Sequence, residues 1–263
     1  MNTEKTHKIQ SLPQGLILDF GGVIVNSSKP NGWQETVTDE ILLLDSSGDL
    51  PSRERILTDL TAGTVAAGLW RNAMSRPLHP IELDQETFVM EFIAADWPPA
   101  AQIAIKRHIA EVCYLIGSTK ETRELREGIE DLLKWCAQIN LPVAIVSNAM
   151  CGQVHRDFLA KAELSGFFVA ELYSDECELR KPNPEFLKLG AKALNLDISQ
   201  CWYVGDHFDR DVLCGVRAGV GANVLMPSPG STPKPFAVPV SADLTVATPR
   251  ELLNEMRNLN ALV

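Results

Sequence analysis

The sequence predicts an α/β protein in which a parallel sheet is covered by helices on both faces and carries a small all-helical cap. After residue 122, short apolar runs of strand length alternate with helical periodicity, and this alternation predicts the sheet. Residues 26–122 show helical periodicity without a convincing buried strand, which predicts the cap. We therefore expect a core of residues 1–25 and 123–263 and a cap of residues 26–122.

The first strand is the apolar run of residues 16–18, which places Asp19 at its carboxyl end, just before Gly21-Gly22. The two glycines permit backbone conformations and close approaches that side chains would block. Open α/β sheets bind their ligands at this edge, so Asp19 is a candidate nucleophile or metal ligand. On this stretch alone, Asp19 also fits a simpler interpretation, a carboxylate at the strand end that caps the following turn.

The remaining elements follow from the period of the apolar residues. Within the cap we predict helices over residues 52–74, 84–95 and 99–116. In the core we predict strands over residues 141–146, 167–172, 201–204 and 222–225. The predicted core helices cover residues 129–136, 154–162, 184–194 and 211–218, and a last helix begins at Pro249 after a proline-containing loop.

Three predicted strands end in a polar side chain suited to chemistry, namely Asp19, Ser147 and Asp206. A parallel sheet brings these ends to one edge. Lys181 lies in a turn between the second and third of them, and Asp211 follows five residues after Asp206. Each also has a simpler interpretation: Ser147 as a helix cap, Lys181 as a solvated loop lysine, and the two aspartates as turn and helix-start charges.

Composition limits the classes of partner. The formal net charge is -10, and we find no cluster of Lys and Arg suited to nucleic acid. No window is apolar enough to span a membrane, and the polar N-terminus lacks a secretory signal, so we expect a cytoplasmic protein. The six cysteines form no C-x-x-C pair, and Cys151 alone falls near a predicted strand end. The oligomeric state cannot be read.

Four ordered segments resemble the motifs of the haloacid dehalogenase-like hydrolase superfamily, in which phosphatases predominate. The resemblance extends over residues 16–253 and implies a Rossmann-like core with an inserted helical cap. The matching positions are residues 19–23 for Asp-x-Asp-x-Thr/Val, Ser147 in its Ser-Asn form with Asn148, Lys181 in Lys-Pro-x-Pro, and Gly205, Asp206 and Asp211 for Gly-Asp-x-x-x-x-Asp.

The resemblance also implies a role for each matching residue. Asp19 would be the nucleophile, forming a phosphoaspartyl intermediate, and Lys181 would neutralise charge. Ser147 and Asn148 would bind the substrate phosphoryl group. The expected cofactor is Mg²⁺, held by Asp19, the Gly21 carbonyl and Asp206, with Asp211 orienting the site. The implied substrate is a small phosphorylated metabolite.

One position departs from the family pattern. The second Asp of the first motif, the general acid of the phosphatases, is here Gly21. Three interpretations follow. A phosphatase could take its acid from His207, Asp209 or a cap residue, or act on esters that need little help; a 2-haloacid dehalogenase expels halide, which needs no proton; or the fold could serve as a non-catalytic binding module. The pair Asp206 and Asp211 favours the metal-dependent phosphatase, because dehalogenation in this family uses no metal.

Overall fold

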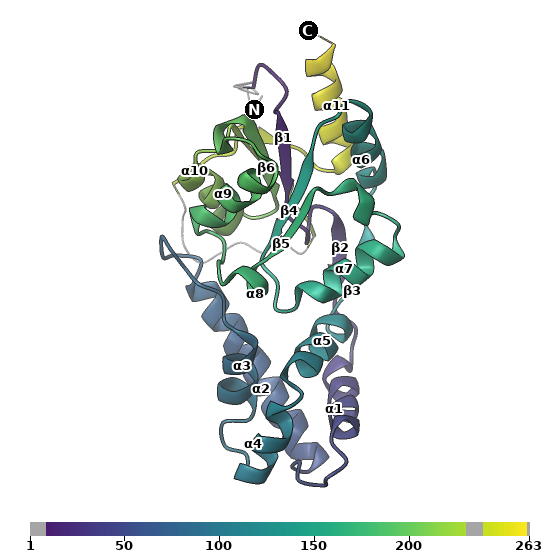
Figure 1. The fold of residues 1–263 in the computed structure, drawn as a ribbon, viewed down its shortest axis with the longest axis vertical. Helices are drawn as coiled ribbons and strands as arrows, with labels where there is room; N and C mark the ends of the chain where they lie inside the picture. Colours follow the sequence, from purple (N-terminus) through teal and green to yellow (C-terminus); the bar gives the residue numbers. More distant parts are fainter. Residues whose placement is uncertain (1–8, 230–238, 262–263) are drawn as a thin grey trace, which may run out of the picture.

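Within the described residues, 9–229 and 239–261, six parallel strands form one sheet in the order β5-β4-β1-β6-β7-β8. The strands of this computed structural model are β1 (Gly15–Leu18), β4 (Val143–Ser147), β5 (Ala170–Tyr173), β6 (Cys201–Gly205), β7 (Ala222–Leu225) and β8 (Leu244–Thr245). The central strand β1 pairs in parallel with β4 and with β6. The predicted α/β fold is therefore confirmed (Figure 1).

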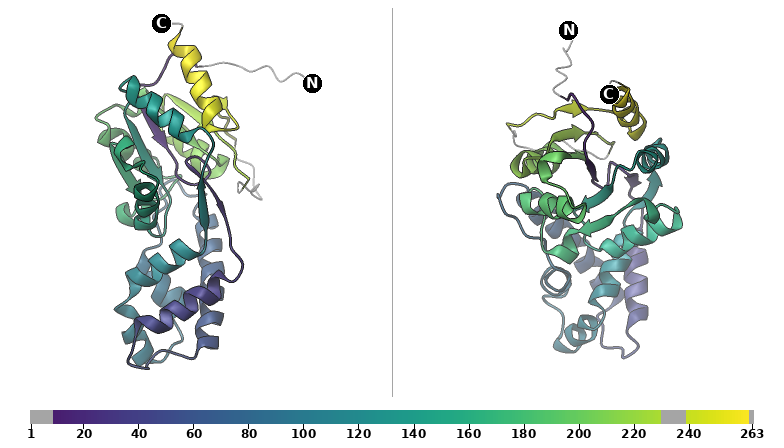
Figure 2. Two further views of the ribbon diagram at one scale, coloured as in Figure 1. Left: turned by 90° about the vertical axis from the view of Figure 1, so that its right-hand side faces the viewer. Right: turned by 45° about the horizontal axis from the view of Figure 1, so that its top comes forward.

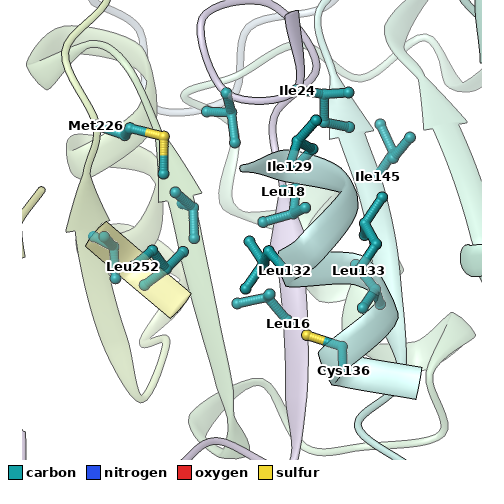
Figure 3. Packing of buried hydrophobic residues seen from close by; sticks show 14 of the residues in the cluster. Leu16, Leu18, Ile24, Ile129, Leu132, Leu133, Cys136, Ile145, Met226 and Leu252 are labelled. Atoms are coloured by element: carbon teal, nitrogen blue, oxygen red, sulfur yellow. The ribbon is translucent and has the colours of Figure 1, made fainter. Parts of the chain in front are cut away.

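The central strands are buried on both faces, which explains their continuous apolar sequences. In β1, Leu16 and Leu18 pack into one hydrophobic cluster, whereas Ile17 packs into another on the opposite face. Figure 3 shows the first cluster, in which the side chains of these two leucines meet those of Leu132 and Leu133.

Helices cover both faces of the sheet. The face of Leu16 is covered by α6 (Ile129–Gln138) and α11 (Pro249–Asn260), and the face of Ile17 by α9 (Pro184–Ala193) and α10 (Leu213–Ala218). The other core helices are α7 (Gly152–Lys161), α8 (Ser174–Cys177), the 3-10 turns Ser165–Phe167 and Ile198–Gln200, and the π-helical turn Phe208–Val212.

The inserted helices form a separate lobe beyond the carboxyl edge of the sheet (Figures 1 and 2). They are α1 (Trp33–Leu44), α2 (Arg53–Ala73), α3 (Gln85–Thr87) with the π-helical Phe88–Ile93, α4 (Pro99–Lys106) and α5 (Ile109–Thr119). Their buried side chains, including Trp33, Ile56 and Phe88, make a hydrophobic cluster of their own. The helical insertion is thus confirmed, whereas its exact domain boundaries stay a prediction.

Two connections join the cap to the core. The chain enters through β2 (Val25–Ser28) and returns through β3 (Thr122–Leu125), which pair antiparallel. On the opposite side of the lobe, residues 76–85, which we call the docking segment, lie against the core (Figure 1). There Ile81 forms an antiparallel bridge with Leu179, and Arg217 donates to the carbonyl of Pro77 at 2.6 Å.

The structure differs from the predicted elements in several places. The strands β2, β3 and β8 and the helix α1 were not predicted. The predicted helix 99–116 is two helices, because Arg107 and His108 each make i→i−3 hydrogen bonds that end α4. The predicted strand 167–172 is displaced to Ala170–Tyr173, behind a 3-10 turn.

Within the described ranges, no helix combines the length and hydropathy that a membrane span requires. All six cysteines are free thiols. The predictions that rest on residues 1–8 and on Pro233 and Pro235 of the proline-containing loop lie outside the described residues.

Candidate active site

Asp19 lies at the carboxyl end of β1, at the centre of the edge on which the cap sits. Because β4 and β6 flank β1 in parallel, Ser147 and Asp206 reach the same edge from either side. All three side chains are buried. The expected convergence of the strand ends is therefore seen in the structure.

Lys181 joins two carboxylates at this edge. Its Nζ lies 2.8 Å from Asp19 Oδ2 and 2.7 Å from Asp211 Oδ1. The Lys181 and Asp211 side chains have no solvent exposure. One buried ammonium between two ionised carboxylates leaves one negative charge in excess, so the ionisation of each of these residues depends on the other two and they form one electrostatic unit.

The pKa values of this unit follow from burial and charge. Burial opposes ionisation of Lys181, but Asp19 and Asp211 outweigh it and raise the pKa of the ammonium. Burial also opposes ionisation of Asp211, but Lys181 and Arg210 outweigh it and lower its pKa. For Asp19, burial prevails over Lys181 and raises the pKa, and the carboxylates of Asp211 and Asp206 add to that rise. Further positive charge near Asp19 would keep it ionised.

Tyr203, on β6, completes the contacts of the ammonium. Lys181 donates a hydrogen bond to the Tyr203 hydroxyl at 2.7 Å, and that hydroxyl donates to Asp211 Oδ1 at 2.7 Å. Burial raises the pKa of Tyr203 well above its usual value, so the hydroxyl keeps its proton. The geometry of Lys181 is therefore fixed from three directions.

The loop after β6 is shaped around Asp211. Asp211 Oδ2 accepts hydrogen bonds from the backbone N–H groups of Asp206 at 3.2 Å and His207 at 2.9 Å. A Cβ atom at Gly205 would lie only 2.3 Å from the Cβ atom of Asp211, so this approach requires glycine. The π-helical turn Phe208–Val212 brings Asp211 back toward the strand end.

Asp206 faces the glycine loop that follows β1. Gly22 has a φ of +74°, and a Cβ atom there would lie 2.3 Å from Asp206 Oδ2. The other oxygen of Asp206 lies 2.6 Å from His207 Nδ1 and 3.3 Å from Arg210 Nη2. Gly22 thus lets the β1 loop approach this carboxylate closely, as a shared cation site would require.

Ser147 and Asn148 follow one another at the end of β4. Both line the cavity at the sheet edge. The Asn148 side chain accepts from the backbone N–H of Lys181 at 2.8 Å and donates to the Lys181 carbonyl at 3.2 Å. Asn148 therefore positions the lysine loop, and its predicted contact with substrate stays a prediction.

A cavity of about 540 Å³ lies between the sheet edge and the cap, a volume suited to a small metabolite. Asp19, Gly21 and Asp206 line it from the core. Among the described residues, five cationic side chains and three carboxylates line this cavity. The cations are Lys29, Arg71, Arg123, Arg180 and Arg210, and the carboxylates are Asp19, Glu121 and Asp206. The cavity is therefore cationic in an acidic chain of net charge -10.

The candidates for a replacement acid are separated by position. His207 lines the cavity, whereas Asp209 is buried outside its described lining. Gly21 itself also lines the cavity; its φ is not positive, and a Cβ atom there would meet nothing within 4 Å. A side chain at position 21 would therefore start in open space and without backbone strain.

The charges of the site suit a divalent cation. The three buried carboxylates Asp19, Asp206 and Asp211 face the buried Lys181 and the partly exposed Arg210, which leaves one negative charge in excess. Ligand atoms of Asp206 and Asp211 also lie within 4.8 Å of one another and of His207. Carboxylate oxygens are the preferred ligands of Mg²⁺, so the donor set fits this ion.

One protein-family model matches most of this chain. The model described as haloacid dehalogenase-like hydrolase matches residues 13–219, most of the chain. This chain is a haloacid dehalogenase-like hydrolase. The fold and motif order predicted from the sequence agree with that membership.

Known relatives of this hydrolase include phosphatases and dehalogenases. It is 29% identical over 101 residues to a glyceraldehyde 3-phosphate phosphatase of Methanopyrus kandleri, an alignment that covers 38% of this chain and 43% of the relative. The matched region thus spans less than half the length of that relative. A 2-haloacid dehalogenase structure from Pseudomonas syringae pv. Tomato DC3000 has a TM-score of 0.60 at 13% identity, covering 97% of this chain and 99% of that one.

A further similar structure contains the expected ion. The HAD-type hydrolase YfnB of Bacillus subtilis, solved with bound magnesium, has a TM-score of 0.53 at 18% identity. The alignment covers 94% of this chain and 99% of that one. At this identity the likeness shows the shared fold, and magnesium dependence of this hydrolase belongs to the proposal below.

Several residues of the site were not singled out from the sequence. Tyr203 carries no local signal, because it is one more apolar-flanked residue of a buried strand. Arg126 ties the site together by donating to the carbonyls of Gly22, Met226 and Ala247, which come from distant loops. Cys151, which the sequence analysis placed near a strand end, is absent from the described lining of the cavity. It packs against the hydrophobic cluster of the cap.

Proposed function

We propose that this hydrolase is a magnesium-dependent phosphatase of small phosphomonoesters, with Asp19 as its nucleophile. The observation that carries the proposal is the buried chain of contacts from Asp19 through Lys181 to Asp211, next to Asp206. The relative named as a glyceraldehyde 3-phosphate phosphatase supports a small phosphorylated substrate.

In the first step, a carboxylate oxygen of Asp19 forms a bond to phosphorus, and the bond from phosphorus to the ester oxygen breaks. The backbone N–H of Phe20 donates to Asp19 Oδ1 at 2.7 Å, and Lys181 holds Oδ2, so the carboxylate is fixed for in-line attack. Ser147 would donate to the phosphoryl oxygens from the end of β4.

In the second step, a water molecule attacks the phosphorus of the aspartyl phosphate. The bond from phosphorus to the Asp19 oxygen breaks, which releases inorganic phosphate and restores the carboxylate. Closure of the cap would separate the cavity, with this water molecule, from bulk solvent.

Magnesium bound by Asp19, the Gly21 carbonyl and Asp206 would offset the negative charge that a phosphoryl group brings to a carboxylate nucleophile. Asp211 would orient this set through the backbone of Asp206 and through Lys181. These roles extend the expectations drawn from the motifs.

Position 21 offers no proton to the leaving oxygen. Esters whose leaving groups are acidic should therefore react fastest, because their oxygen departs as an anion. The described cavity lining includes His207 and, from the cap, Glu121 as candidate replacements for that proton donor.

One observation favours a second candidate, 2-haloacid dehalogenation. A halide leaves without a proton, so a glycine at position 21 would cost that reaction nothing. The carboxylate pair Asp206 and Asp211 argues against it, because the metal-free reaction has no use for an excess of negative charge beside its nucleophile.

A single panel separates the candidates. Phenyl phosphates, alkyl phosphomonoesters and 2-haloacids are assayed with Mg²⁺ and with a chelator. We expect phosphate release that the chelator abolishes. Halide release that survives the chelator would replace the phosphatase by the dehalogenase, and no turnover of any compound would favour the non-catalytic module.

A further inference from the structure

Arg71 and Arg180 form an unusual charge cluster on the wall of the cavity. Arg71 belongs to the last turn of cap helix α2, whereas Arg180 precedes Lys181 in the core. Both contact Glu82 of the docking segment: Arg71 Nε lies 3.4 Å from its Oε1, and Arg180 Nη1 bonds its Oε2. Ser174 donates to the same Oε2 at 2.6 Å, and the backbone N–H of Leu83 donates to Oε1 at 3.0 Å.

This cluster has one positive charge in excess, since two guanidinium groups share one carboxylate. The Glu82 side chain is only 1% exposed and the Arg180 side chain only 8%, so water screens the charges weakly. Burial lowers the pKa of Arg180, and the neighbouring Arg71 lowers it further against the effect of Glu82. A second anion beside the two guanidinium groups would balance the cluster.

The cluster also has hydrogen-bond donors to spare. The Nη2 group of Arg71 and the Nε group of Arg180 are buried, and no described residue accepts a hydrogen bond from either. Buried donors without acceptors are costly, so these two groups leave the cluster incompletely paired. Both residues line the same cavity as Asp19.

We propose that Arg71 and Arg180 bind a second anionic group of the substrate, a carboxylate or a second phosphate, while the scissile phosphoryl group sits at Asp19. This rests on the proposed phosphatase function and narrows its substrate class. Guanidinium groups recognise carboxylate and phosphate through paired N–H donors, which an aldehyde or hydroxyl cannot match. The cavity of about 540 Å³ accommodates a phosphate ester of a few carbons with anions at both ends.

The test compares three-carbon ligands that differ at one end. Glycerol 3-phosphate has one anion, 3-phosphoglycerate adds a carboxylate, and glycerol 1,3-bisphosphate adds a phosphate. Dissociation constants are measured by calorimetry with Mg²⁺ in Asp19→Asn, which does not consume the ligand, and kcat/KM is measured in the wild type. We expect 3-phosphoglycerate or glycerol 1,3-bisphosphate, or both, to bind tenfold or more tightly than glycerol 3-phosphate. Comparing these two ligands identifies whether the site prefers a carboxylate or a phosphate as the second anionic group.

Substitution of Arg71 tests the assignment. Arg71→Leu keeps the bond of Glu82 to Arg180 and should reduce the tenfold preference to about unity, whereas Arg71→Lys should keep part of it because the charge remains. Arg53→Leu is the matched control, since Arg53 lies on the same helix but pairs with Asp39 at the surface. It should leave the preference unchanged.

The outcomes separate this inference from the proposed function. Equal binding of all three ligands would overturn the second-anion site even if phenyl phosphate is hydrolysed. Tighter binding of a doubly anionic ligand without any hydrolysis would support the site and reject the phosphatase. If Arg71→Leu weakened all ligands alike, the cluster would only fasten the cap to the core, and the proposal would be wrong.

Discussion

Asp19 is the side chain on which the proposed chemistry depends most directly. In Asp19→Asn the amide is a poor nucleophile, so turnover should fall by roughly 10⁴-fold or more while the fold is kept. Phosphate release from phenyl phosphate measures the loss. Mass spectrometry of the fresh protein controls for deamidation back to Asp. Full activity in verified Asp19→Asn would mean that catalysis occurs elsewhere or in a contaminant.

Gly21 is the position at which the sequence departs from the phosphatase pattern, and the structure leaves space there. Because a Cβ atom at this position meets nothing within 4 Å, Gly21→Asp should fold normally and restore a proton donor. The ratio of kcat/KM for phenyl phosphate to that for an alkyl phosphate should then narrow by roughly 10²-fold. An unchanged ratio in a correctly folded variant would show that the missing acid does not limit the reaction.

His155 makes the stability of the protein depend on pH. Burial, with Arg123 and Arg156 nearby, lowers the pKa of His155 to about 3. Between that value and the unfolded value near 6.5, the unfolded chain binds a proton that the folded protein does not, so stability falls as pH falls. From pH 7 to pH 5 this residue should cost about 2 kcal/mol.

The control for this prediction is His155→Phe. The ring of His155 stacks on Phe20 with centroids 4.1 Å apart, and phenylalanine preserves an aromatic ring there. Urea unfolding of both proteins at pH 7 and pH 5 gives the two free-energy differences. Equal losses in wild type and variant would assign the pH dependence to other groups.

At the scale of elements, Glu82 supplies the buried ion pair between the docking segment and Arg180 of the core. Glu82→Gln would leave Arg71 and Arg180 without a buried counter-charge, so the free energy of unfolding should fall by about 3 kcal/mol. The matched control is Glu86→Gln, which removes an exposed ion pair with Lys106 and should cost about 0.5 kcal/mol or less. Similar costs in both variants would contradict the assignment.

The sequence predicted elements well where burial is continuous. The strands β1, β4, β6 and β7 are buried along their lengths, so each appears as a short apolar run. The strand β2 has a single buried residue, and its partner lies about 95 residues away, so no local pattern could show it.

The same limit applies to the site. The convergence of Asp19, Ser147 and Asp206 could be predicted from the sequence, because topology alone places strand ends at one edge. Tyr203 and Glu82 could not, since their roles depend on how side chains from distant segments pack. Sequence reasoning therefore identified the groups proposed for chemistry, with Asp211 and Asn148, and missed other groups that position them, such as Tyr203.

At the scale of the molecule, the register of β2 and β3 suggests a clean test of the cap. Ser28 pairs with Thr122, so a two-residue Asn-Gly turn between them can replace residues 29–121. The hydrophobic clusters of the sheet contain no residue of the cap, and the core should therefore fold. We expect kcat/KM for small alkyl phosphates to fall by roughly 10²-fold and substrate preference to be lost. Unchanged rates and preference would show that the lobe is not a functional cap.

The attachment of the cap on two sides has a consequence for the kinetics of substrate capture. The β2–β3 pair is a covalent connection that persists in every state, whereas the docking segment is held by noncovalent contacts, among them those of Glu82, Arg217 and Asn183. Opening on this side therefore requires the docking segment to leave the core, and the strength of its contacts lowers the population of the open state. If substrate enters only the open state, its association rate constant scales with that population and lies below the diffusion limit. Weakening the contacts of Glu82 would then raise the association rate constant of the substrate and also raise its dissociation rate constant.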